Sequence, residues 1–128
     1  MTHQEAVRYW LEGAEEAWKT AKHLYKGKRY DHSLFFVHLT IEKVLKAVYI
    51  DGKSEAPPLV HNLSKLAKDC ALALSEREIK QLDEISKFNI SARYEDIKLK
   101  LYKKATSQYT KIWLGIAEEF YRKFKAEI

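Results

Sequence analysis

Apolar side chains recur three and four residues apart along almost the whole chain. In the first 26 residues this spacing produces one stripe, formed by Val7, Trp10, Ala14, Ala17, Ala21 and Leu24. The period places these residues on one face of an α-helix, which must pack against other elements to leave water. Only four glycines and two prolines stand among the 128 residues. An all-β sandwich or barrel needs more turn residues than that.

The pattern therefore predicts a single all-α domain over residues 1–128, an up-and-down bundle of about five helices. The first helix begins at a possible capping box of Thr2 and Glu5 and ends near Gly27. The second begins at Asp31 or Ser33 and ends at residues 51–52. Because it is apolar over more than half of its circumference, we expect it to be central, touching several neighbours or a second subunit.

Three further helices are expected after the proline-containing loop at residues 51–60. Asn62 and Ser75 are candidate N-caps of two short helices, and Glu78 completes a capping box with Ser75. The pattern breaks between residues 89 and 97. A long final helix then runs from Leu99 to Phe124, with Gly115 interpreted as a close-packing point.

Composition excludes several classes of protein. No run of 18 apolar residues exists, so no transmembrane helix is expected, and the first ten residues lack the apolar region of a signal peptide. A single cysteine, Cys70, rules out an intrachain disulfide and fits a reducing cytoplasm. The net charge of +5 permits contact with nucleic acid, nucleotide phosphate or an acidic protein without requiring any of them.

Motifs for cofactor chemistry are missing. The sequence has no glycine-rich phosphate loop, no His-Glu-x-x-His, no Cys-x-x-Cys and no nucleophile elbow. We therefore expect neither a metal nor a cofactor, and Cys70 is most simply a small core residue.

Four polar residues near the second helix are candidates for a site. His38, Glu42 and Lys46 lie at i, i+4 and i+8, which places them on one line of the helix. They form either a salt-bridged surface stripe or a polar groove between subunits or beside a ligand. His61 follows the Pro-Pro loop, where it either helps to start the third helix or performs acid–base work.

A second candidate site lies in the irregular stretch before the final helix. Arg93 is suited to hold a phosphate and Tyr94 to stack on a base, or else Arg93 bridges Glu95 or Asp96 while Tyr94 packs on the bundle. Residues 93–111 contain six basic residues, including Lys98, against two acidic ones, a net charge of +4 with three tyrosines interleaved. This composition suits a nucleic-acid groove, and it equally suits a solvated helix face.

Four segments of the chain together resemble the HEPN family of small helical domains. Residues 10–30 carry Trp10, spaced alanines and Gly27; residues 38–47 read HLTIEKVLKA; residues 57–63 read PPLVHNL; and residues 92–94 read ARY. The family's Ala/Thr-Arg-Tyr-Pro has Glu95 here in place of proline. The resemblance covers nearly the whole chain.

The resemblance implies a helical bundle that usually dimerises. Many such domains act as partners of a minimal nucleotidyltransferase, often in a toxin–antitoxin pair. Others are metal-independent ribonucleases in which an arginine stabilises phosphate charge and a histidine, separated from it by four to six residues, helps the ribose 2′-hydroxyl attack. Arg93 matches that arginine, but Lys98, Leu99 and Lys100 follow at the histidine's positions, and no histidine follows His61.

The sequence therefore favours a non-catalytic HEPN-type module, a homodimer that binds a nucleotidyltransferase partner, a nucleotide or RNA. The expected ligand-binding residues are Arg93, Tyr94, Lys98, His38, Glu42, Lys46 and His61. One alternative is a degenerate ribonuclease that uses Arg93; another is a purely structural helical module.

Overall fold

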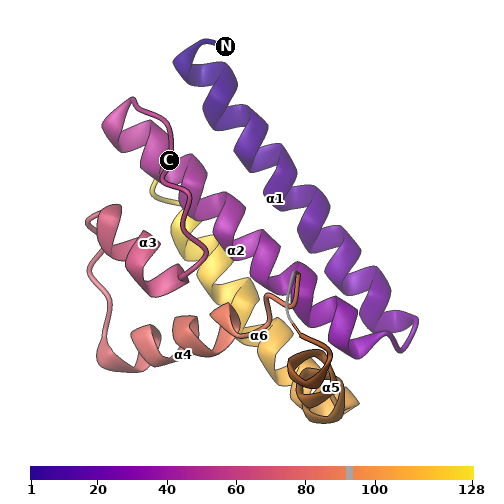
Figure 1. Ribbon diagram of the computed structural model, residues 1–128. Helices are drawn as coiled ribbons and strands as arrows, with labels where there is room; N and C mark the ends of the chain where they lie inside the picture. Colours follow the sequence, from indigo (N-terminus) through magenta and orange to yellow (C-terminus); the bar gives the residue numbers. More distant parts are fainter. Residues whose placement is uncertain (92–93) are drawn as a thin grey trace.

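The computed structural model describes residues 1–91 and 94–128, and all regular structure in these two segments is α-helical (Figure 1). The helices are α1 (His3–Lys26), α2 (Tyr30–Lys53), α3 (Leu63–Asp69), α4 (Glu76–Ser86), α5 (Glu95–Lys104) and α6 (Ser107–Lys125). The predicted all-α bundle is confirmed, with six helices in place of five. None of the helices in the described segments is long and apolar enough to cross a bilayer.

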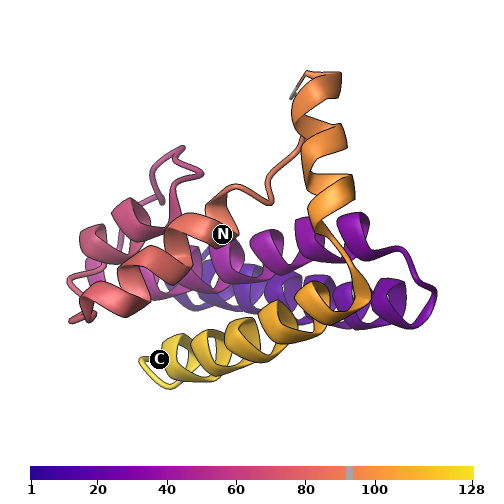
Figure 2. The same ribbon diagram turned by 90° about the horizontal axis from the view of Figure 1, so that it is seen from below.

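Helix α2 lies at the centre of the molecule. It runs antiparallel to α1 and also contacts α3, α4, α5 and α6 (Figures 1 and 2). Its apolar face is fully buried at Leu34, Val37, Ile41, Val44, Leu45 and Ala47. The prediction that this helix touches several neighbours is therefore confirmed.

Side-chain caps start three of the helices where the sequence predicted them. Thr2, Asn62 and Ser75 each accept a hydrogen bond from the backbone N–H three residues later. Ser75 and Glu78 form a complete capping box. At Thr2 the Glu5 carboxylate accepts a hydrogen bond from the Thr2 hydroxyl and not from the Thr2 backbone N–H, so this capping box is incomplete.

The turn between α1 and α2 differs from the prediction. Helix α1 ends as expected, with Gly27 at its C-cap, but Lys28 is the residue that takes the left-handed conformation, with φ of 61°. Helix α2 begins at Tyr30, so neither Asp31 nor Ser33 caps it. Ser33 is instead buried inside the helix, and its hydroxyl donates to the Ala21 carbonyl of α1 at 2.7 Å. That bond satisfies the hydroxyl in the core.

The predicted long final helix is two helices. Helix α5 begins at Glu95, ahead of the expected Leu99, and ends at Lys104; α6 starts at Ser107. Thr106 separates them because its side chain accepts the N–H of Tyr109 and so caps α6. Figure 2 shows the result: α6 lies along the bundle while α5 stands out from it.

Gly115 is not a close-packing point. It lies exposed on α6, and a Cβ built on it would meet no atom within 4 Å, whereas one on Gly13 of α1 would approach Lys43 Cδ to 3.2 Å. The apolar periodicity predicts that Gly115 lies in a helix, but it does not show that the space beside its Cα is open to solvent.

We predict that Gly115→Ala raises the free energy of unfolding by about 1 kcal/mol, because alanine loses less backbone entropy in a helix and has open space here. Urea denaturation followed by circular dichroism measures the change. Gly13→Ala is the matched control, and its gain should be smaller because the Lys43 side chain must move. An equal or larger gain at Gly13 would contradict this assignment.

Candidate functional site

The carboxylate of Glu42 is the centre of a polar cluster inside the bundle. Its Oε2 accepts a hydrogen bond from Lys46 Nζ at 2.9 Å, one helical turn away. Its Oε1 lies 3.0 Å from His61 Nδ1, which comes from the loop before α3. The side chains of Glu42 and Lys46 are both 7% exposed, so this ion pair is desolvated and depends on these contacts.

His38 completes the cluster from the other side of Glu42. Its Nε2 lies 3.4 Å from Glu42 Oε1 and 3.4 Å from the backbone carbonyl oxygen of His61. Both neighbours are acceptors, so Nε2 carries the proton. Its Nδ1 is buried and has no hydrogen-bond partner within residues 1–91 and 94–128.

Lys46 has a second partner that the sequence did not identify. Its ammonium lies 5.2 Å from the centroid of the Trp10 ring on α1, within range of a cation–π interaction. In the sequence, Trp10 is a member of the apolar stripe of the first helix, and nothing in that pattern indicates a contact with a lysine. The cluster therefore joins α1, α2 and the loop before α3.

The protonation states follow from these surroundings. Burial lowers the pKa of His38 below its ordinary 6.5, against the opposing attraction of Glu42, so the ring is neutral. Burial alone would raise the pKa of Glu42, but hydrogen bonds from His61 and Lys46 outweigh it and the pKa is lowered below 4.5. The carboxylate is thus ionised at neutral pH.

Four of the seven predicted site residues are brought together here. His38, Glu42 and Lys46 do share one face of α2, but the interpretation as a surface stripe is wrong, because all three are buried. His61 directly precedes the N-cap Asn62, at the start of the third helix, and its side chain remains 67% exposed.

Two of the other predicted residues lie at the start of α5: Tyr94 is its N-cap, and Lys98 is in its first half. Tyr94 is 82% exposed, so the expectation that it packs on the bundle is wrong. Lys98 Nζ lies 3.6 Å from Glu95 Oε1 at the surface. Arg93 lies outside the described residues.

An open groove of about 500 Å³ separates α5 from the start of α2, and we call it the α2–α5 groove. Its apolar surface comes from Phe35 on one wall and from Leu99 and Tyr102 on the other. Its polar surface includes Lys98 and two carboxylates. The lining is Asp31, His32, Phe35, Ile90, Ser91, Glu95, Lys98, Leu99 and Tyr102. Phe35 and His32 belong to no motif in the sequence that marks them as part of a site.

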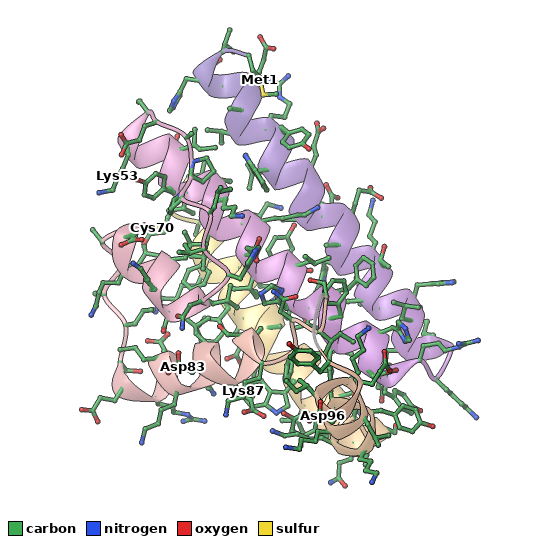
Figure 3. The ribbon with its side chains drawn as sticks, in the orientation of Figure 1. Met1, Lys53, Cys70, Asp83, Lys87 and Asp96 are labelled. Atoms are coloured by element: carbon green, nitrogen blue, oxygen red, sulfur yellow. The ribbon has the colours of Figure 1, made fainter. Side chains whose placement is uncertain are left out.

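A second ionic network fixes the base of α5. The carboxylate of Glu84 on α4 accepts hydrogen bonds from Tyr109 of α6 and from Lys104 of α5. Lys104 also lies 5.4 Å from the Tyr109 ring centroid. The network thus connects α4 and α5 to α6. In Figure 3, Lys87 marks the end of α4 and Asp96 marks the start of α5.

No group of three or more metal-binding side chains comes together in the described part of the chain. Cys70 lies half-buried at the end of α3 (Figure 3). Its thiol lies 3.4 Å from the Leu45 carbonyl oxygen. Burial raises the pKa of this thiol to about 11, so it is protonated and unreactive at neutral pH.

Comparisons with known proteins agree with this architecture. The model of the HEPN domain family matches residues 7–127. The chain is also similar in fold to the protein TT1696 from Thermus thermophilus, whose crystal structure superposes with a TM-score of 0.80 at 18% identity. That superposition covers 95% of this chain and 98% of the Thermus chain. No curated protein matches the sequence.

We predict that Glu42→Ala lowers the free energy of unfolding by about 3–5 kcal/mol, because Lys46 then remains buried without a carboxylate. Adding Lys46→Met should restore a large part of the loss, since methionine fills a similar volume with no charge. Urea denaturation of both variants gives the two values. A double variant no more stable than Glu42→Ala would show that the uncompensated charge is not the cause.

The cluster also predicts acid sensitivity. The pKa of His38 is lower in the folded state than in the unfolded chain, so the unfolded chain binds the proton more readily. The resulting stability is fully present above pH 6.5 and is lost as the pH falls below it, and the lowered pKa of Glu42 adds a further loss below pH 4.5. Thermal unfolding midpoints between about pH 8 and pH 5 should decrease for the wild type and decrease less for His38→Gln. If the unfolding midpoints of the wild type and of His38→Gln decrease equally, protonation of groups other than His38 causes the loss of stability.

Proposed function

Because the chain belongs to the HEPN domain family, we propose that it is a homodimeric module whose binding surface near α5 is non-catalytic and binds a nucleotidyltransferase partner, a nucleotide or RNA, within a toxin–antitoxin-like pair. The nucleotidyltransferase partner is what the family resemblance implies. The ribose-directed ribonuclease motif lacks its histidine, since Arg93 is followed by lysines at residues 98 and 100. A lysine at its reference pKa of about 10 is a poor general base at neutral pH.

The observation that carries the proposal is the exposed aromatic and basic surface of α5 beside the α2–α5 groove. Tyr94 and Tyr102 are 82% and 65% exposed, and Leu99 is 51% exposed. Exposed rings beside lysines suit stacking on bases together with contact to phosphate. The same apolar surface suits burial against a second copy of the chain.

Nucleotide-bearing ligands are the best-supported occupants of the groove. Lys98 lies in its wall and supplies a cation for a phosphate near this end of α5. The two carboxylates in the lining, Asp31 and Glu95, favour a ligand that also offers hydrogen-bond donors, as bases and ribose do.

We predict that fluorescein-labelled single-stranded RNA binds the wild-type chain at low salt and that Tyr94→Ala and Lys98→Glu each weaken binding about tenfold. Fluorescence anisotropy measures the affinity. Lys80→Glu, on α4, makes the same charge change as Lys98→Glu and should weaken binding much less. Equal effects of the two lysine variants would indicate a nonspecific charge contribution.

Light scattering with gel filtration on the same samples tests the oligomeric state. A dimer at micromolar concentration is expected, and a strict monomer would contradict the homodimer. Metal-free cleavage of RNA that is lost in Arg93→Ala would replace the binding module with the ribonuclease alternative.

A further inference from the structure

The imidazole of His61 is anchored at one nitrogen and open at the other. Nδ1 is 3.0 Å from the Glu42 carboxylate, while the side chain as a whole is 67% exposed. Within residues 1–91 and 94–128, Nε2 makes no hydrogen bond or ion pair. Neither nitrogen belongs to the α2–α5 groove, so this feature is separate from the proposed binding function.

The carboxylate determines the tautomer of the ring. Ionised Glu42 can only accept hydrogen bonds, so His61 Nδ1 must be the protonated nitrogen. In the neutral ring Nε2 then carries the lone pair, on a side chain that is 67% exposed. A carboxylate that holds an imidazole in this tautomer also stabilises the imidazolium that forms when Nε2 takes a proton.

The surroundings hold the dyad in place. Lys46 fixes the second oxygen of Glu42 at 2.9 Å, and the carbonyl of His61 accepts from His38. The neighbouring Val60 packs on the hydrophobic core, and two prolines stiffen the preceding chain. The ring is therefore preorganised, which is what a general base needs.

His32 provides an internal comparison. Its Nδ1 lies 3.1 Å from the carboxylate of the adjacent Asp31, and its side chain is 59% exposed, close to the exposure of His61. The Asp31 side chain is 18% exposed, against 7% for Glu42. Glu42 alone of the two is fixed by a buried lysine.

We propose that Glu42 and His61 form a proton-transfer dyad in which His61 Nε2 deprotonates water for attack on an ester bound at the loop before α3. His61 is the catalytic residue and Glu42 the positioning residue. The substrate class is an ester, of either a carboxylic or a phosphoric acid, whose electrophilic atom a water molecule can reach beside the exposed ring.

The step balances without a further reagent. Nε2 takes one proton from water as the water oxygen forms a bond to the carbonyl carbon or the phosphorus. The bond from that atom to the leaving oxygen then breaks, and the alkoxide or phenolate departs with the electron pair. The imidazolium returns its proton to the leaving group or to solvent, and Glu42 remains ionised throughout.

The test uses two probe esters, p-nitrophenyl acetate and bis(p-nitrophenyl) phosphate, with release of p-nitrophenolate as the readout. We expect the steady-state rate with at least one of them to fall about tenfold or more in His61→Ala and to stay unchanged in His3→Ala, which removes another exposed histidine that lies 3.9 Å from a carboxylate, that of Asp51. Added imidazole should restore part of the rate to His61→Ala. The probe that is hydrolysed distinguishes a carboxylic from a phosphoric ester.

Glu42 is tested in the Glu42→Gln/Lys46→Met double variant, which keeps the buried volume and removes both charges. We expect its rate to fall and the ¹⁵N chemical shifts of the His61 ring to show a mixture of tautomers where the wild type shows one. Equal hydrolysis of both esters by wild type and His61→Ala, or no hydrolysis of either, would overturn the proposal. RNA binding by His61→Ala should match that of the wild type. Failure of the ester-hydrolysis test would therefore leave the proposed RNA binding at the α2–α5 groove unaffected.

Discussion

The ionised carboxylate of Glu42 determines much of the arrangement around α2. A charged side chain that is buried between packed helices is stable only where an opposite charge or hydrogen bonds compensate it. Lys46 supplies the countercharge from the same face of α2, and His61 comes in from 19 residues later in the chain. That second contact fixes where the loop crosses the bundle. The next residue, Asn62, then caps α3, and Leu63 enters the core.

The helical architecture follows closely from the amino-acid pattern, because burial of an apolar stripe and side-chain capping are local effects. The stripe of α1, the central role of α2 and the caps at Thr2, Asn62 and Ser75 were all predictable. Errors arose where a tertiary or competing local contact prevailed. Ser33 bonds to α1 and does not cap α2, and Thr106 caps α6 within a stretch whose apolar period continues across it.

The candidate site was less predictable. Helical spacing places His38, Glu42 and Lys46 on one face, but spacing alone left open whether that face is a surface stripe or a polar groove. Only packing shows that it is buried, and the partners Trp10 and His61 come from other parts of the chain. The α2–α5 groove exists because α5 stands out from the bundle. The spacing of apolar residues does not predict the direction in which a helix points.

Helix α5 is attached to the molecule by little apolar contact. Leu101 is its one buried residue among ten, and the Glu84 network holds its C-terminal end. Segments with few buried contacts open at lower free energy than the core around them. The outer wall of the groove is therefore the most readily displaced part of its lining, so the spacing between the walls can change while α1, α2 and α6 keep their packing. A ligand that touches both walls would slow amide hydrogen exchange in α5 more than in the bundle.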